Sequence, residues 1–409
     1  MLVVGVLALG YNLRGAITSL PPVFPELQSS LGLSSTTISI LAATPVICFG
    51  AVSGFAASLA RRAGEERVLL GASIALVIGL VARGAAPGAL LFPGTILGSG
   101  AIAVMNVLLS SLIKRRWPER AGFLIGLYIM ALSAGAIVAS LVSVPLWQGT
   151  GGSVTLTLGG LAAPAALAVL LWLPQARSAP RPTATAAAAG RPAARPRPAR
   201  VAVYRYAVTW HVTIFMGMQS LLYYATLSWL PTMLRDRGES AAAAGDLLAL
   251  MGVGNLAVSL FIPMLAQRMR SQVALVVPTT IAVTAGLAGL LYLPLGGAVG
   301  WALILGAGQN AALALAIFFT AARAPHAAAA ASLSSLAQAV GYLLASAGPL
   351  EVGLLHSATG SWTAPVMVLF ALSAVMLVAG LLAARPRMLP AGQEKNEMAE
   401  QVAKTGGTA

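Results

Sequence analysis

Arg14 is the residue whose position is hardest to explain without a ligand. It lies near the middle of an apolar segment long enough to cross a membrane, where a charge costs about 2.5 to 3.5 kcal/mol on insertion scales. Of the 11 Asp and Glu residues, only Glu351 is left as a candidate partner inside another such segment, near its outer end. A guanidinium without a carboxylate partner suits a planar anion. We therefore predict that Arg14 binds an anionic substrate. The alternative is a structural arginine bonded to backbone carbonyls, water or Glu351.

Polar and aromatic side chains also occur at middle depths of other apolar segments. Gln219 and Tyr223 are four residues apart, and Gln338 and Tyr342 repeat this spacing, so each pair shares one helix face. Such side chains can alternatively hydrogen-bond neighbouring helices, at about 0.6 kcal/mol each. The predicted substrate-binding residues are Arg14, Asn106, Tyr128, Gln219, Tyr223, Asn255, Gln309, Asn310, Gln338 and Tyr342.

Proton coupling would need a titratable group inside the apolar segments. The candidates are His211 and Glu351, with a tyrosine or the substrate itself as further possibilities; the alternative for His211 is a packed or water-bonded histidine. The sequence has no nucleophile motif, phosphate-binding loop or metal-ligand cluster, which argues against an enzyme, an ATP-driven pump, a metal and a cofactor. Cys48 is the only cysteine, so no intrachain disulfide can form.

The composition indicates the class of protein that positions these residues. The chain has 409 residues, of which 58% are hydrophobic and 9% charged, and its mean hydropathy is +0.85. These values predict an all-α integral membrane protein without a sizeable soluble domain. Its apolar runs predict twelve transmembrane helices, at residues 2–24, 35–60, 67–83, 88–112, 120–145, 153–174, 204–231, 244–267, 272–293, 298–320, 327–355 and 362–384.

The positive charges predict how these helices are oriented. With a cytoplasmic N-terminus, all but four of the 25 Lys and Arg residues fall on the cytoplasmic side; the exceptions are Arg14, inside the membrane, and Arg83, Arg235 and Arg237, outside. Because positive loops stay in the cytoplasm, we expect a multi-pass protein of the cell inner membrane with both termini cytoplasmic. The net charge of +14 then reflects topology and contact with anionic lipid, not a nucleic-acid partner.

The sequence also repeats itself in a parallel sense. Leu97-Gly-Ser-Gly100 matches Leu305-Gly-Ala-Gly308 at corresponding places in the two parts of the chain. We expect six-helix halves at 1–174 and 204–385, with substrate bound between them near the membrane midplane. An Ala/Pro/Arg-rich cytoplasmic linker, 175–203, would join them, and a disordered cytoplasmic tail, 386–409, would follow.

Several stretches carry a family resemblance. They are Asn12-Leu-Arg-Gly-Ala-Ile-Thr-Ser19, Asn106-Val-Leu-Leu109, Ser111-Leu-Ile-Lys-Arg115, Gln219-Ser-Leu-Leu-Tyr-Tyr-Ala-Thr-Leu-Ser-Trp-Leu-Pro231, Gly308-Gln309 and Ala337-Gln-Ala-Val-Gly-Tyr-Leu-Leu344. Together they resemble the major facilitator superfamily and, more narrowly, its cyanate and 2-nitroimidazole transporter family. The resemblance implies the fold of this superfamily, a monomeric protein, and secondary transport of a small anionic or polar organic compound. Arg61 departs from the superfamily motif between helices 2 and 3, which has Asp there.

We therefore predict a secondary transporter that works by alternating access, with its small-molecule substrate held by Arg14. The first alternative is a multidrug or metabolite exporter of the same fold with neutral substrates and a structural Arg14. The second is a membrane receptor or scaffold that acts through the Arg-rich linker, in which case deleting residues 183–198 would abolish function. The substrate, the direction of transport and the coupling ion stay open.

Overall fold

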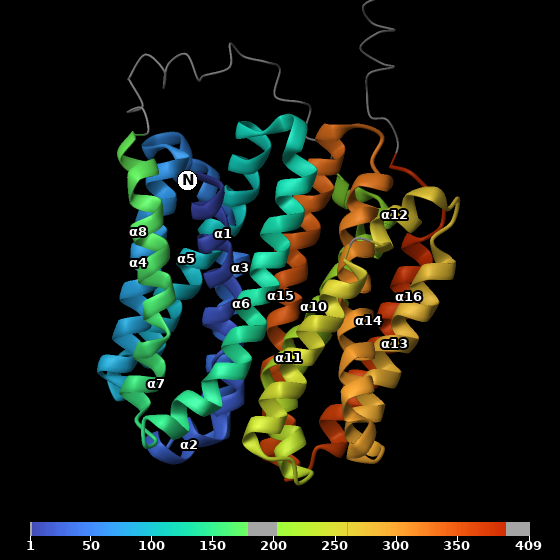
Figure 1. Cartoon of the computed structure of the whole chain (residues 1–409). Helices are drawn as coiled ribbons and strands as arrows, with labels where there is room; N and C mark the ends of the chain where they lie inside the picture. Colours follow the sequence, from blue (N-terminus) through green and yellow to red (C-terminus); the bar gives the residue numbers. More distant parts are fainter. Residues whose placement is uncertain (1, 179–202, 260, 390–409) are drawn as a thin grey trace, which may run out of the picture.

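The computed structural model describes residues 2–178, 203–259 and 261–389, and within these ranges its regular elements are all helical (Figure 1). The first half contains α1 (Leu2–Thr18), η1 (Pro21–Val23), α2 (Phe24–Leu31), α3 (Ser35–Ala63), α4 (Glu65–Ala85), α5 (Pro87–Arg116), η2 (Pro118–Arg120), α6 (Ala121–Gly149), α7 (Val154–Gly160) and α8 (Ala162–Ser178). The second half contains η3 (Val203–Arg205), α10 (Ala207–Asp236), α11 (Ala241–Val258), α12 (Phe261–Arg268), α13 (Val273–Tyr292), η4 (Leu295–Gly297), α14 (Ala298–Ala322), α15 (Ala327–Thr359) and α16 (Thr363–Ala383). The all-α prediction is confirmed.

The described helices include eleven spans that are long and apolar enough to cross a membrane. The remaining predicted span corresponds to α10, which has 30 residues but carries polar side chains such as Gln219, Ser220 and Thr226. These side chains are buried against other helices, so α10 contributes to the interior of the bundle. Most of the predicted linker and most of the predicted tail lie outside the described residues.

The first predicted helix, 2–24, is interrupted in the structure. Helix α1 ends at Thr18, and Pro21 and Pro22 begin the short turn η1 before the chain continues as α2. Proline lacks an amide hydrogen and disfavours helical geometry in the residue before it, which explains the break. Thr18 and the last carbonyls of α1 therefore lie inside the bundle, one turn beyond Arg14.

Arg83, predicted to lie on the outer side, is in the last turn of α4, where only 2% of its surface is exposed. Its Nη1 donates a hydrogen bond of 3.3 Å to the carbonyl oxygen of Ala16, in the last turn of α1. The C-terminal carbonyls of a helix lack intrahelical partners and carry partial negative charge, so a buried cation is stabilised there.

The two halves lie side by side, with α1–α8 on one side of Figure 1 and α10–α16 on the other. Helix α3 packs along α15 and α6 packs along α11, so these two pairs form the contact between the halves. Glycine permits the closest approaches. A Cβ at Gly353 of α15 would collide with the side chain of Ser39 of α3, and one at Gly252 of α11 would lie 2.8 Å from Cγ1 of Ile137 of α6.

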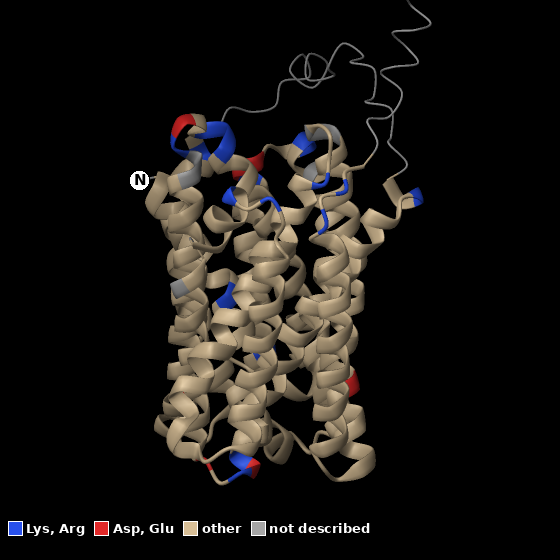
Figure 2. Ribbon diagram, turned by 90° about the vertical axis from the view of Figure 1, so that its right-hand side faces the viewer, with Lys and Arg blue, Asp and Glu red and all other residues tan. Residues whose placement is uncertain are grey.

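Charged residues mark the two ends of the bundle (Figure 2). We call the end where α5 finishes at Lys114, Arg115 and Arg116 the basic end. There Glu66 accepts hydrogen bonds from Arg115 and Arg116, at 3.1 and 2.9 Å. We call the opposite end, where α1 finishes and α3 begins, the far end.

The halves are tied together at the far end. A carboxylate oxygen of Glu26, on α2, lies 2.7 Å from Nη1 of Arg235, on α10. Beside this ion pair, the rings of Phe24 and Trp229 have centroids 6.3 Å apart, and Trp229 donates a hydrogen bond to the carbonyl oxygen of Pro349. The Glu26–Arg235 ion pair and the Phe24–Trp229 ring contact therefore both join the first half to the second.

Candidate substrate-binding site

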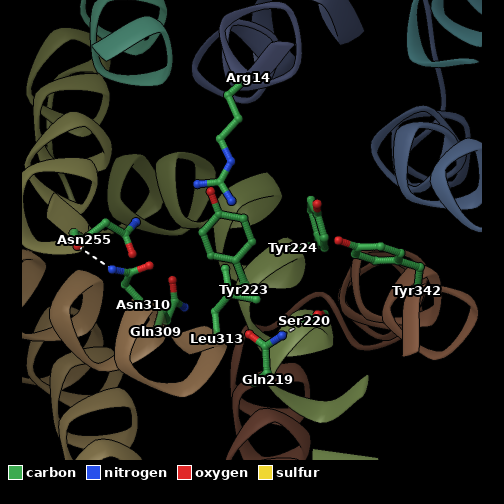
Figure 3. A pocket seen from close by; sticks show the side chains of 10 residues that line it. All are labelled: Arg14, Gln219, Ser220, Tyr223, Tyr224, Asn255, Gln309, Asn310, Leu313 and Tyr342. Atoms are coloured by element: carbon green, nitrogen blue, oxygen red, sulfur yellow. Dashed lines mark hydrogen bonds between the residues drawn. The ribbon is translucent and has the colours of Figure 1, made fainter. Parts of the chain in front are cut away.

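Arg14 projects from α1 into a cavity between the halves (Figure 3). In the described part of the chain, no carboxylate oxygen lies within 4.0 Å of its guanidinium, and no group accepts a hydrogen bond from it. Its one specific contact is with Tyr223, whose ring centroid lies 5.1 Å from the guanidinium carbon. This cation–π contact is attractive, but it leaves all five N–H donors of the guanidinium free.

The cavity around the guanidinium has a first part that we call the polar compartment. It offers about 30 Å³ of free space, enough for roughly two water molecules. Its lining consists of Arg14, Gln219, Ser220, Tyr223, Tyr224, Asn255, Gln309, Asn310, Leu313 and Tyr342. Arg14 comes from the first half, and all the other lining residues come from α10, α11, α14 and α15 of the second half.

Amide side chains form one wall of the polar compartment. Asn310 donates a hydrogen bond of 2.6 Å to the backbone oxygen of Asn255, and Gln219 donates one of 2.6 Å to Oγ of Ser220. Gln309 is 3% exposed, yet neither its amide nitrogen nor its amide oxygen has a hydrogen-bond partner. An unpaired buried amide is costly, so Gln309 can gain much from a polar ligand or an ordered water.

Tyrosine rings form the opposite wall. Tyr223 and Tyr224 meet edge to face with centroids 5.1 Å apart, and Tyr342 packs in the same manner on Phe49, at 6.1 Å. Aromatic walls with free hydroxyl groups suit a small flat ligand that also accepts hydrogen bonds.

A second part of the cavity, the far compartment, lies beyond Arg14. It offers about 20 Å³ and is lined by Arg14, Thr18, Ser133, Ala136, Ile137, Ser140, Tyr223, Leu227, Leu248, Met251, Gly252 and Asn255. Arg14, Tyr223 and Asn255 line both compartments, so they form the boundary between them.

The structure brings seven of the predicted site residues to the cavity, and it places the others elsewhere. The seven are Arg14, Gln219, Tyr223, Asn255, Gln309, Asn310 and Tyr342. Tyr128 donates a hydrogen bond of 3.0 Å to Oδ1 of Asn106 inside the first half, and neither residue lines the two compartments. Gln338 is exposed and donates to Ser334, at 2.9 Å.

The two residues predicted for proton coupling line neither compartment. His211 lies near the start of α10, and its Nδ1 is buried without a hydrogen-bond partner. Glu351 lies on α15 and is partly buried. Among the described residues, no group of three or more His, Cys, Asp and Glu side chains could hold a metal ion.

Sequence reasoning missed Tyr224 and the far compartment. Adjacent helical residues point about 100° apart, so the face defined by Gln219 and Tyr223 does not include Tyr224. The cavity is wide enough to expose both tyrosines. The far compartment combines side chains of α1, α6, α10 and α11, and no spacing within one helix indicates such a combination.

Comparisons with known proteins agree with this architecture. The model of the Major Facilitator Superfamily matches residues 3–349. An uncharacterized transporter of Bacillus subtilis (strain 168) is 38% identical over 395 residues, which is 95% of this chain and 94% of that protein. Among solved structures, a D-xylose–proton symporter superposes with a TM-score of 0.74 at 15% identity, over 95% of this chain and 98% of that one.

Two relatives that match most of the chain have names that include a transported compound. The 2-nitroimidazole transporter of Escherichia coli (strain K12) is 34% identical over 393 residues, covering 95% of this chain and 96% of that protein. The cyanate transport protein of the same organism is 28% identical over 367 residues, covering 88% and 91%.

Proposed function

The chain belongs to the major facilitator superfamily and, within it, to the cyanate and 2-nitroimidazole transporter family, and we propose that it transports a small monoanion bound at Arg14. As a member of this family it is a multi-pass membrane transporter of small substrates. The proposal concerns the charge of the substrate and the residue that holds it.

The free guanidinium of Arg14 carries the proposal. It faces a cavity, and the described residues give it neither a carboxylate nor a hydrogen-bond acceptor. A partly buried charge without a partner is unfavourable, and a bound anion would neutralise it. A single free positive charge in the cavity lining matches a ligand with a single negative charge.

The size of the polar compartment supports a ligand of a few heavy atoms. Cyanate is a linear monoanion of three atoms, and it fits the free space of about 30 Å³. A nitro group is planar and presents two oxygens as a carboxylate does, so a guanidinium fork can bind either group. Arg14 can therefore contact either of the two compounds in the relatives' names, but a nitroimidazole ring needs a wider cavity than this conformation offers.

The position of the site between the halves supports alternating access. Arg14 belongs to the first half, and the amides and tyrosines belong to the second, so a substrate that contacts both draws the halves together. At the far end the halves are already joined by Glu26 and Arg235. Rocking of the halves about the site would break that ion pair and expose the cavity to the other side of the membrane.

We also propose the inner membrane as the location, with the basic end in the cytoplasm. Positive residues near the ends of spans favour the cytoplasmic side, and Lys114, Arg115 and Arg116 lie at the basic end. Both termini, the linker at 175–203 and the tail at 386–409 would then be cytoplasmic. One chain provides both halves of the site, which is consistent with a functional monomer.

A set of Arg14 variants tests the proposal. We expect Arg14→Ala to weaken cyanate binding by at least about 30-fold, the lower end of the effect of truncating one member of a buried charge pair. Arg14→Lys should recover little, because an ammonium group cannot form the two parallel hydrogen bonds of a guanidinium. The measurement is uptake of labelled cyanate by purified protein in liposomes. Arg62→Ala, which removes an exposed arginine at the basic end, is the matched control. Native affinity in an inserted Arg14→Ala protein would contradict the proposal.

A second candidate function is export of neutral aromatic compounds. The observation that favours it is the wall formed by Tyr223, Tyr224 and Tyr342, which can stack on an uncharged ring. In that case Arg14 has a structural role, and neutral nitroimidazoles should stabilise the native protein and Arg14→Ala equally in a thermal-shift assay. Stabilisation of the native protein alone, by anions, favours the first function.

A further inference from the structure

The far compartment is available to a part of the substrate that is not charged. Resting on the proposed anion site, we infer that it is an apolar subsite for a short hydrocarbon tail, and that the preferred substrates are short-chain monocarboxylates from acetate to butyrate. Their carboxylate binds Arg14, and their tail extends toward the far end.

Apolar side chains form most of the far compartment. Ile137 of α6, Leu227 of α10, and Leu248 and Met251 of α11 contribute to its wall, together with the methyl group of Ala136. Leu227, Leu248 and Met251 are otherwise buried in the bundle. Such a wall stabilises methylene groups by about 0.8 kcal/mol each when they leave water.

The hydroxyl groups of the far compartment are largely engaged. Thr18 donates to the backbone oxygen of Arg14 or of Ala136, at 3.1 and 3.2 Å, and Ser140 donates to that of Ala136, at 3.0 Å. Ser133 and the boundary residue Tyr223 are the lining residues whose hydroxyl groups have no hydrogen-bond partner among the described residues. Two free hydroxyl groups beside four large apolar side chains favour hydrocarbon over a second charged group.

The geometry at Arg14 and the amide of Gln309 favour the far compartment as the place for the hydrocarbon tail. In a two-pronged guanidinium–carboxylate pair both oxygens face the fork, so the tail points away from Arg14. In the polar compartment a tail would lie against Gln309, whose unpaired amide would stay unpaired. In the far compartment it covers Ile137 and Leu248, and the polar compartment remains free for water that pairs with the amides.

The size of the far compartment limits the tail. About 20 Å³ holds one or two water molecules, whereas a cavity that binds benzene has about 150 Å³. A chain of one or two carbons therefore fits, a chain of three reaches the limit, and an aromatic ring does not fit. Glu26 and Arg235 hold the halves together at the far end, so a longer chain cannot pass outward in this conformation.

A homologous series of acids tests the inference. Binding of formate, acetate, propionate, butyrate and benzoate is measured by thermal stabilisation of the purified full-length protein, beside cyanate as the reference anion. We expect affinity to rise about fourfold for each added methylene up to propionate or butyrate, and to be lost for benzoate. Ile137→Phe should abolish the rise by filling the compartment, and Ile137→Ala should shift the optimum to longer acids.

The controls are Val138→Phe and Val138→Ala, because Val138 is the next residue of α6 and is 40% exposed on the outside of the bundle. Both should leave the series as in the native protein. The opposite effects of Ile137→Ala and Ile137→Phe keep the test informative if one variant fails to insert.

Two results would overturn the inference, and they differ in what they say about the anion site. If affinity is flat or falls from formate onward while Arg14→Ala still abolishes cyanate binding, the tail subsite is wrong and the anion site stands. If no anion binds in an Arg14-dependent manner, both are wrong.

Discussion

The carboxylate of Glu26 and the guanidinium of Arg235 lie 2.7 Å apart and join the two halves of the protein at the far end. Both side chains are largely buried, with 17% and 25% of their surfaces exposed. Because the pair must separate when the far end opens, its strength helps to determine how often the cavity opens on that side.

We therefore predict that Glu26→Gln opens the far end more often. A partly buried ion pair contributes about 1 to 2 kcal/mol to the closed state, so its loss corresponds to a five- to 30-fold rise in the population that is open at the far end. The measurement uses Cys48→Ala with a cysteine placed at Leu227, labelled by a thiol reagent that cannot cross the membrane. Labelling should accelerate by that factor in Glu26→Gln. Exchange of the two charges, Glu26→Arg with Arg235→Glu, should restore the slow rate. Equal rates in all three proteins would show that the ion pair does not control opening.

The contact between Arg14 and Tyr223 gives a second prediction. Tyr223→Phe keeps the ring and should change anion affinity less than threefold. Tyr223→Leu removes the ring and with it about 0.5 to 2 kcal/mol of attraction for the guanidinium, which leaves Arg14 less ordered and lowers affinity by two- to 30-fold. Titration of the purified protein with cyanate measures both. Tyr204→Leu, at an exposed tyrosine outside the cavity, is the control. A larger loss in the Phe variant than in the Leu variant would show that the hydroxyl, not the ring, matters.

Gln309 should lower the stability of the ligand-free protein and raise its affinity for anions. Its buried amide has no hydrogen-bond partner, so Gln309→Leu removes an unsatisfied polar group of similar size. We expect the ligand-free protein to become more stable by about 1 to 3 kcal/mol and the affinity for anions to fall about tenfold. Thermal unfolding with and without cyanate measures both changes. Gln338→Leu, at an exposed position on α15, should change neither. A destabilised Gln309→Leu protein would indicate that the amide is already satisfied.

The charge in the cavity predicts a response to membrane potential. Neither compartment is lined by an Asp, Glu or His residue, so a bound monoanion moves with its charge unless a proton comes from elsewhere. An inside-positive potential of 100 mV should then raise accumulation in liposomes by up to about 50-fold, equivalent to about 2.3 kcal/mol. A potassium gradient with valinomycin sets the potential. Uptake that follows a pH gradient and ignores the potential would instead indicate proton coupling, for which His211 and Glu351 remain the predicted groups.

Much of the fold could be predicted from the sequence, because long apolar runs in a membrane protein have few alternatives to helices. The predicted span at 272–293 differs from α13 by one residue at each end. The break after Thr18 was harder to place, because Pro21 and Pro22 restrict the chain without indicating how it continues. The burial of Arg83 was not predicted, because a window of hydropathy does not reveal that a neighbouring helix ends beside it.

The site could be predicted only in part. Arg14 and Gln309 were identified because a charge or an amide in an apolar helix is unusual enough to notice. Gln338 shares a face with Tyr342, but it lies one helical turn, about 5.4 Å, nearer the basic end and pairs with Ser334 instead. Asn106 and Tyr128, also predicted to bind substrate, are joined by a hydrogen bond and lie outside the lining of both compartments. The spacing of residues in the sequence predicts which helix face they share, but the side chains of neighbouring helices determine whether that face lines the cavity.

The lining of the polar compartment has a consequence for how selectivity can change during evolution. Arg14 is its one contribution from the first half, and every other lining residue comes from the second. Substitutions in the second half can therefore reshape the recognised compound while the charge requirement imposed by α1 stays constant. A hybrid that joins this first half to the second half of a relative should take its polar-compartment contacts from the relative, while the far-compartment residues of α1 and α6 stay those of this protein.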